Sequence, residues 1–243
     1  MIDDPWLLLA LAAVAITYAM VGHGGASGYL ALMALWGFPQ DLMRPSALVL
    51  NLFVSAIGFV QFARAGHFRW KLFRPFAIAS VPMAWLGAQV VLDVGVYRKV
   101  LAVCLLIAVA RMLGLFGAGR DAERPLQLPV ALVAGAVLGF LSGLIGIGGG
   151  ILLSPLLLIA GWANARTTAA ISAAFIFVNS ASGLIGVLGR GETVDTNLWP
   201  LVLVAVAGGL LGGWIGARRL PDLRLRQVLG VVLLFACIKL MVA

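Results

Sequence analysis

Long apolar runs separated by short polar loops dominate the hydropathy pattern of this chain. Most of the runs approach or match the roughly 20 residues that span the hydrocarbon core of a bilayer, so each predicts a membrane-spanning helix. The uninterrupted runs cover residues 47–62, 76–92, 100–116, 169–188, 198–217 and 228–242. The pattern therefore predicts an all-α, polytopic helical membrane protein.

Two further apolar stretches, residues 6–36 and 130–162, are interrupted by clusters of glycine. The second cluster reads GLIGIGGG over residues 143–150, and a cruder copy, GHGGASG, occupies residues 22–28. Each glycine costs roughly 1 kcal/mol of helix stability relative to alanine, so we expect the helix to break at both places. A break inside a bilayer must turn its freed backbone groups towards protein or a watery cavity. One break in each half therefore predicts a site.

The order of features repeats along the chain, which indicates a duplication. Asn51 matches Asn179, Gly58 matches Gly186, and the motif WLGA at residues 85–88 matches WIGA at residues 214–217. We expect a single transmembrane transporter domain, residues 1–243, with the site between the two repeats. Repeat 1 covers about residues 5–117, a polar linker residues 118–128, and repeat 2 about residues 129–243.

Loop charge favours two halves of opposite orientation. If each broken stretch is a hairpin that enters and leaves on one side, followed by three spanning helices, twelve of the 17 Lys and Arg lie in cytoplasmic loops and five outside. Halves of the same orientation would give nine against eight, without the excess that the positive-inside rule requires. We therefore expect inverted repeats in the cell inner membrane, with both termini outside.

Composition agrees with a membrane protein and narrows the function. The chain is 63% hydrophobic and 11% charged, whereas soluble domains carry about 25% charged residues. The net charge of +8 is scattered through short loops, so we expect no nucleic-acid partner. No catalytic set and no metal-spaced His, Cys and Glu cluster occurs, so we expect no enzyme, cofactor or metal. The nine acidic residues lie at termini or in loops, which favours an anion or a neutral solute over a cation.

The two breaks suit a small anion. Each offers backbone N–H groups at the start of a new half-helix, near Ser27 and near Ile151, and glycine lets a ligand approach the backbone closely. In an inverted pair the two tips meet near the bilayer midplane. The candidate substrate-binding residues are glycines or polar residues at the breaks and in mid-span: His23, Gly24, Gly25, Ser27, Asn51, Gly148, Gly149, Gly150, Ser172 and Asn179.

Several of these residues have a second explanation that the sequence leaves open. His23 would suit proton coupling or pairing with the anion, or it bonds a carbonyl freed by the break. The matching asparagines could contact substrate or join helices. Arg44 could attract the anion, although snorkelling to the interface is the simpler account. Glycines 208–216 are best explained by close helix packing alone. A coupling proton and assembly into a homo-oligomer are not decided by the sequence.

The motif GFLSGLIGIGGG at residues 139–150, followed by SPL at residues 154–156 and repeated in weaker form at residues 22–25, resembles the TauE/SafE sulfite exporter family, also called TSUP or DUF81. The resemblance covers nearly the whole chain and implies transport of sulfite or of sulfonates such as sulfoacetate. The first half departs from the family pattern at residues 26–31 and at His23, which bears on substrate identity more than on fold. A passive anion channel and a non-transporting membrane accessory subunit are the alternatives.

Overall fold

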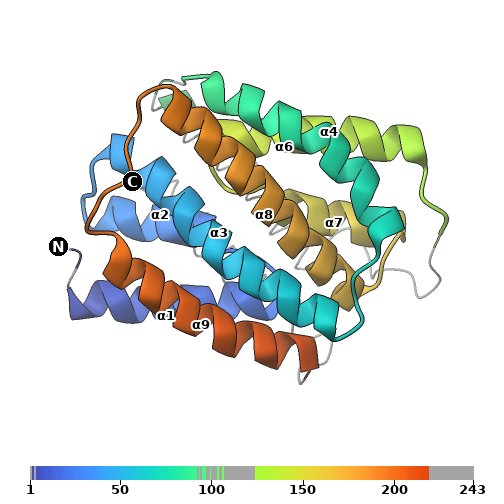
Figure 1. The fold of residues 1–243 in the computed structure, drawn as a ribbon, viewed down its shortest axis with the longest axis horizontal. Helices are drawn as coiled ribbons and strands as arrows, with labels where there is room; N and C mark the ends of the chain where they lie inside the picture. The colour runs from blue at the N-terminus through green and yellow to red at the C-terminus, as the bar shows by residue number, and fades with distance from the viewer. Residues whose placement is uncertain are drawn as a thin grey trace.

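A computed structural model describes residues 2, 4–91, 93, 95, 96, 99, 103, 106 and 124–218 of the chain. These residues form an all-α structure without a strand. The helices are α1 (Pro5–Met20), α2 (Ala26–Leu35), α3 (Gln40–Arg64), α4 (Trp70–Gln89), α6 (Leu128–Ile145), α7 (Gly150–Ala160), α8 (Ala165–Gly189) and α9 (Trp199–Arg218) (Figure 1). The linker and the third expected span of each half, residues 100–116 and 228–242, lie largely or wholly outside the described residues.

Each glycine-broken stretch folds into two helices whose outer ends lie together. In the first stretch, α1 and α2, the indole Nε1 of Trp36 donates to Asp4 Oδ2 at 2.9 Å. In the second, α6 and α7, the backbone N–H of Arg124 donates to the carbonyl of Gly161 at 2.7 Å. The chain thus returns to its starting point in both stretches, as a hairpin requires.

Glycines with positive φ make both breaks, because side-chain-bearing residues rarely adopt this backbone region. α2 begins at Ala26 and α7 at Gly150, each within one residue of the start expected from the sequence. The glycines with positive φ at the breaks are Gly22 (74°), Gly25 (94°), Gly146 (82°), Gly148 (73°) and Gly149 (73°).

The two halves pack by the same scheme. α1 lies along α9, and α6 lies along α4; α3 contacts α9, and α8 contacts α4. Glycines allow the closest of these approaches: a Cβ on Gly216 would collide with the carbonyl of Met20, and one on Gly143 with the carbonyl of Ala84. Glycines 208, 212 and 216 all meet α1 in this way, so the packing role expected for this run is confirmed.

α3 and α8 lie side by side at the centre of the bundle and run in opposite directions (Figure 1). A Cβ on Gly58 of α3 would contact Ala173 near the start of α8, and one on Gly183 near the end of α8 would contact Leu48. Between these contacts, Asn51 in the middle part of α3 is hydrogen-bonded to Ser180 of α8, so the two helices pack antiparallel along much of their length.

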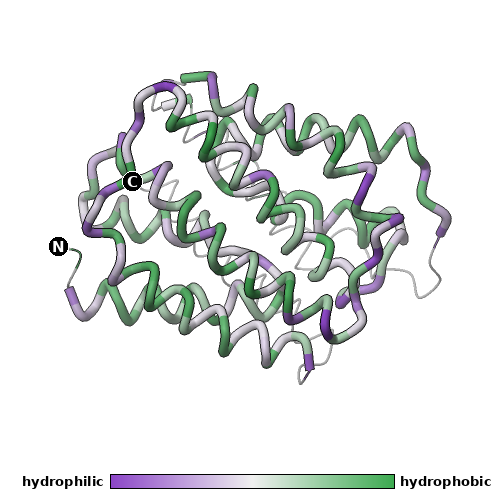
Figure 2. Tube along the Cα trace, viewed as in Figure 1, coloured by the Kyte–Doolittle hydropathy of each residue, from purple (hydrophilic) through white to green (hydrophobic). Residues whose placement is uncertain are grey.

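Four of the described helices are long and apolar enough to cross a membrane: residues Asp41–Arg64, Leu128–Ile145, Ala165–Gly189 and Trp199–Arg218. α4 has 20 residues but is not among these four, and α1 and α7 are shorter apolar helices. Large apolar side chains stay exposed on the outside of the bundle, such as Leu203 (66%) and Val133 (66%). Hydrophilic residues gather mostly at helix ends and turns (Figure 2). A bundle with this surface requires a lipid environment.

Candidate functional site

The two glycine tips converge on one side chain, Asn51 of α3. A Cβ on Gly24, in the first tip, would collide with the carboxamide oxygen of Asn51 and lie 3.1 Å from Ile176. A Cβ on Gly148, in the second tip, would lie 2.7 Å from Asn51 Nδ2 and 2.7 Å from Ile176. Residues more than a hundred positions apart are therefore brought together where α3 packs against α8.

Asn51 connects the start of α2 to α8. Its Oδ1 accepts a hydrogen bond from the backbone N–H of Ala26 at 3.1 Å, and its Nδ2 donates to Ser180 Oγ at 3.3 Å. The first N–H groups of a helix have no partner within the helix, so Asn51 caps α2 from another helix. Its side chain is fully buried.

A second polar chain runs beside the tips. His23 places Nδ1 3.0 Å from the carbonyl of Val21 and Nε2 3.1 Å from Ser154 Oγ. Ser154 Oγ in turn lies 2.7 Å from Ser172 Oγ. The chain therefore joins the first tip to α7 and α8 through buried groups. The imidazole does bond a carbonyl freed by the break, and it also has a partner in the opposite hairpin.

The remaining glycines of the tips pack against aromatic rings and small side chains. A Cβ on Gly25 would meet the ring of Tyr29, and one on Gly149 would lie 2.9 Å from Phe175 and 3.1 Å from Ser142 Cβ. A Cβ on Gly150 would collide with Ile176 and lie 3.1 Å from the carbonyl of Ser172. No side chain caps α7, because its N-cap residue is Gly149.

Ser27 and Asn179 make hydrogen bonds that lead away from the contact of the tips. Ser27 Oγ lies 2.9 Å from the hydroxyl of Tyr18, inside the first hairpin. Asn179 Nδ2 donates to the carbonyl of Phe175, one turn earlier in its own helix, at 2.8 Å. Asn179 Oδ1 is buried and has no hydrogen-bond partner. The matching asparagines thus have different environments.

The side chain of Arg44 is not placed as snorkelling to the membrane interface would predict. Its guanidinium is part-buried and donates to the carbonyl of Gly143, near the end of α6, and to the carbonyl of Ala88, near the end of α4, at 3.3 Å. Carbonyls in the last turn of a helix lack partners within the helix, and they form the negative end of its dipole. Arg44 therefore joins α3 to the ends of two helices inside the protein.

Ser154 and Ser142 are the neighbours of the tips to which the sequence assigned no individual role, whereas Ser180 is one of the span serines that the sequence leaves between binding a ligand and bonding its own helix. Ser154 interrupts the otherwise apolar run of α7 one turn after its glycine start, and that position is the signal that could have drawn attention to it. Serines in membrane helices usually bond their own backbone, which hides those that bond across helices. Ser55 of α3 follows the usual pattern, donating to the carbonyl of Leu52.

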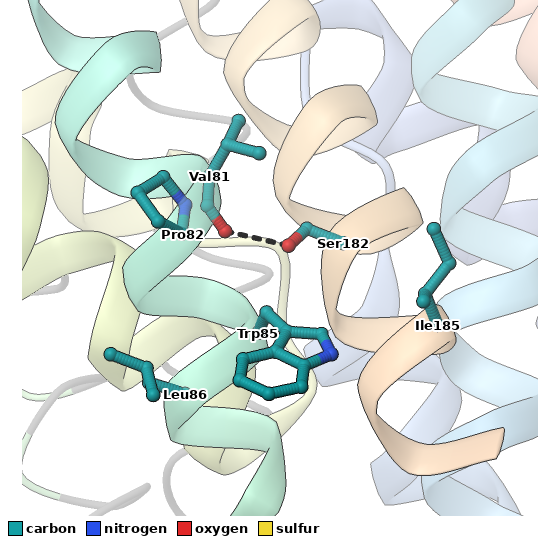
Figure 3. A pocket seen from close by; sticks show the side chains of 6 residues that line it. All are labelled: Val81, Pro82, Trp85, Leu86, Ser182 and Ile185. Carbon is teal, nitrogen blue, oxygen red and sulfur yellow. Dashed lines mark hydrogen bonds between the residues drawn. The ribbon is translucent and has the colours of Figure 1, made fainter. Parts of the chain in front are cut away.

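An open groove of about 490 Å³ lies elsewhere, between α4 and α8 (Figure 3). Trp85 and Leu86 line it from α4 and Ile185 from α8, and all three are exposed to the outside of the bundle. Ser182 Oγ, at its edge, donates to the carbonyl of Val81 at 2.6 Å and so has no donor left for a ligand. This groove faces lipid and is separate from the glycine tips. No group of three or more His, Cys, Asp or Glu side chains within the described residues could hold a metal ion.

Comparison with known proteins gives the family. The model of the sulfite exporter TauE/SafE family matches residues 7–240. A protein of Sinorhizobium fredii named as a probable membrane transporter is 40% identical over 242 residues, 97% of each chain. Proteins given the same description in Xylella fastidiosa and Methanocaldococcus jannaschii are 30% and 28% identical, over 81% and 76% of this chain and 82% and 72% of theirs. No solved structure matches the chain significantly. The chain therefore belongs to the TauE/SafE sulfite exporter family and is a membrane transporter of that family.

Proposed function

We propose that this protein is a secondary transporter of small sulfur-containing anions, sulfite or an organosulfonate, in the cell inner membrane. The anion is held between the two glycine tips near the bilayer midplane. One observation carries the proposal: both tips contact Asn51, near the middle of α3, where α3 is hydrogen-bonded to α8. The name of the family supports sulfite as a member of the substrate class.

Inverted repeats explain why the tips meet. α3 and α8 occupy the same place in their halves and run in opposite directions, and α1 and α6 each lie along a helix of the other half. Two halves related in this way enter the membrane from opposite faces, so their broken helices end at the same depth. The loop-charge excess predicted from the sequence supports the same orientation, with both termini outside.

The groups around the tips suit an oxyanion. Asn51 Nδ2 and the hydroxyl of Ser180 are donors, and the start of α7 adds backbone N–H groups at the positive end of a helix dipole. A sulfite or sulfonate group has three oxygens that can accept from several directions. The tips touch Asn51 directly, so the anion enters only when they separate.

A flux assay tests this function. Purified protein in liposomes is assayed with sulfite, thiosulfate, sulfoacetate and sulfate, with and without a proton gradient. We expect saturable uptake of at least one sulfur anion, and its response to the gradient decides whether a proton is coupled. Uptake that does not saturate would indicate a passive anion channel instead of a transporter. The absence of flux for every anion would overturn the proposal.

A pair of variants links the flux to the tips. N51D removes a donor and adds a negative charge between the tips, so we expect at least a tenfold loss of anion uptake. The matched control is N197D, the same change at an exposed position in the loop before α9, and it should transport normally. Equal uptake by both variants would place the anion elsewhere.

A further inference from the structure

Asn51 and Asn179, which match between the repeats, are in two different states. Asn51 uses both ends of its carboxamide, one on Ala26 and one on Ser180. Asn179 folds back onto its own helix through Nδ2 and leaves Oδ1 buried without a partner. A buried acceptor without a partner is costly, so its persistence calls for an explanation.

The two helix starts at the tips, those of α2 and α7, also differ. The start of α2 is capped by Asn51, whereas α7 begins after Gly149 with no side-chain cap. The hydroxyl of Ser142 is buried near this uncapped start and has no hydrogen-bond partner, and Ser142 Cβ would lie 3.1 Å from a Cβ on Gly149. One unpartnered hydroxyl thus lies next to the helix start that lacks a cap, and α8, which packs against this start through Phe175 and Ile176, carries the second unpartnered atom on Asn179.

We infer that Asn51 and Asn179 alternate as caps of α2 and α7 during transport, and that the anion binds to whichever helix start is uncapped. In the state described, Asn51 covers α2, and the start of α7 with Ser142 is the one left for the anion once the tips separate. In the opposite state Asn179 Oδ1 accepts from the start of α7, and Asn51 turns back to its own helix and frees α2. This inference rests on the proposed inverted repeats, because such halves exchange conformations between the two facing states.

The alternation of the two caps explains how one binding site can open first to one side of the membrane and then to the other. The capping oxygen and an anion oxygen compete for the same N–H groups, so a cap on one tip leaves only the other available. Because Ser180 follows Asn179 directly in α8, rotation of that turn would affect the Asn51–Ser180 bond together with Asn179. The two caps are therefore coupled through adjacent residues.

Cysteine accessibility tests the alternation without any substrate. Reporters are placed at the matching positions of the two helix starts, S27C in α2 and I151C in α7, in a background in which Cys104 and Cys237 are replaced by serine. Both positions are buried in the present state. A membrane-impermeant methanethiosulfonate is applied to oriented vesicles from each side, and the labelling rates are compared.

Removing one cap should shift the labelling towards the state held by the other. N51A should raise labelling of S27C and lower that of I151C, each by about fivefold, because a helix cap contributes about one power of ten or less to an equilibrium. N179A should do the reverse. It removes the unpartnered Oδ1 together with one hydrogen bond to the carbonyl of Phe175 in the same helix, so we expect it to fold with little change in unfolding temperature while its flux falls.

The matched control is N164A, which removes the same kind of cap from α8, where Asn164 Oδ1 accepts from Thr167 N at 2.9 Å. It should leave the ratio of the two labelling rates unchanged. Shifts in the same direction for N51A and N179A, or no shift beyond that of N164A, would overturn the alternation. If N51A and N179A shift the labelling rates in opposite directions but the protein transports no sulfur anion, the alternation of caps stands and only the proposed substrate is wrong.

Discussion

The first and second glycine tips are built from matching residues, yet their chemistry differs. The first carries His23, which is hydrogen-bonded to the opposite hairpin, and its helix start is capped by Asn51. The second has apolar Ile147 at the matching position, three glycines with positive φ and no side-chain cap. The first tip is thus satisfied by protein groups, and the second leaves its donors available.

The two tips differ in chemistry although the helices around them pack by the same scheme. We expect a duplicated site to become specific for its substrate in this way. Helix packing needs both halves to keep glycines at the same contacts, so these positions tolerate little change. At the tips the glycines are held by positive φ and close contacts, but the residues between them differ, such as His23 in the first tip and Ile147 in the second. We expect the selectivity of this transporter to reside in the first tip and the binding of charge in the second.

The largest effect should come from filling the space at the second tip. G148L should abolish transport while the protein still inserts into the membrane, because Gly148 has φ 73° and its Cβ would press on Asn51 Nδ2. G37L is the matched control, since Gly37 has φ 72° with nothing within 4 Å of its Cβ. Flux in liposomes and insertion by membrane fractionation distinguish the two. Normal transport by G148L would mean that the tip serves packing alone.

Smaller effects than that of G148L, and similar ones in the two halves, are expected at the glycine packing contacts that both halves share. G143A and G216A each direct a methyl group at a backbone carbonyl, so each should destabilise the protein by about 1–3 kcal/mol. G189A, with nothing within 4 Å, should be neutral or stabilising. Thermal unfolding in detergent measures all three. A large loss in one half only would show that the halves are not mechanically equivalent.

The His23 contact should affect pH dependence more than affinity. H23A removes the group next to Ser154, so we expect a flatter pH profile of transport, with KM changed by less than about threefold. H67A, at the other histidine of the chain, is the control and should keep the profile. A normal profile in H23A would leave the residue with a structural role in the first tip.

The smallest effect is expected at Asp4, where the outer ends of α1 and α2 meet. Hydrogen bonds from the Trp36 indole and the Trp6 backbone lower the pKa of Asp4 below its ordinary value of 3.8. A carboxyl with a lowered pKa in the folded state stabilises it at pH above the unfolded value, and this contribution is lost as pH falls through the folded value. D4N should therefore lower Tm slightly at pH 7, and the difference from wild type should disappear below pH 3.8. If the Tm of D4N differs from that of wild type by the same amount down to acid pH, the effect comes from altered hydrogen-bond geometry and not from the charge of Asp4.

The positions of the helix breaks could be predicted from the sequence because glycine density acts locally. Ala26 and Gly150 begin their helices within a residue of the expected starts. Asn51 could be identified because it is polar in an apolar span, and the structure places it against both tips.

The sequence could not predict which side of α8 faces the tips. α8 is apolar almost all round, so its hydropathy does not define a buried face, and a shift of one residue turns a side chain by about 100°. That rotation gives the contact with Asn51 to Ser180 and not to Asn179. The hydrogen bonds of Ser154 depend likewise on how α7 docks onto α8 and the first tip, which is a tertiary property.

The pairing of α1 with α9 and of α6 with α4 means that each hairpin is attached to a helix from the other repeat. We therefore expect the bodies that move during transport to combine helices from both predicted repeats. A chain cut in the linker would yield two fragments that each expose glycine-lined backbone meant for the other. Such fragments should accumulate and transport only when they are produced together.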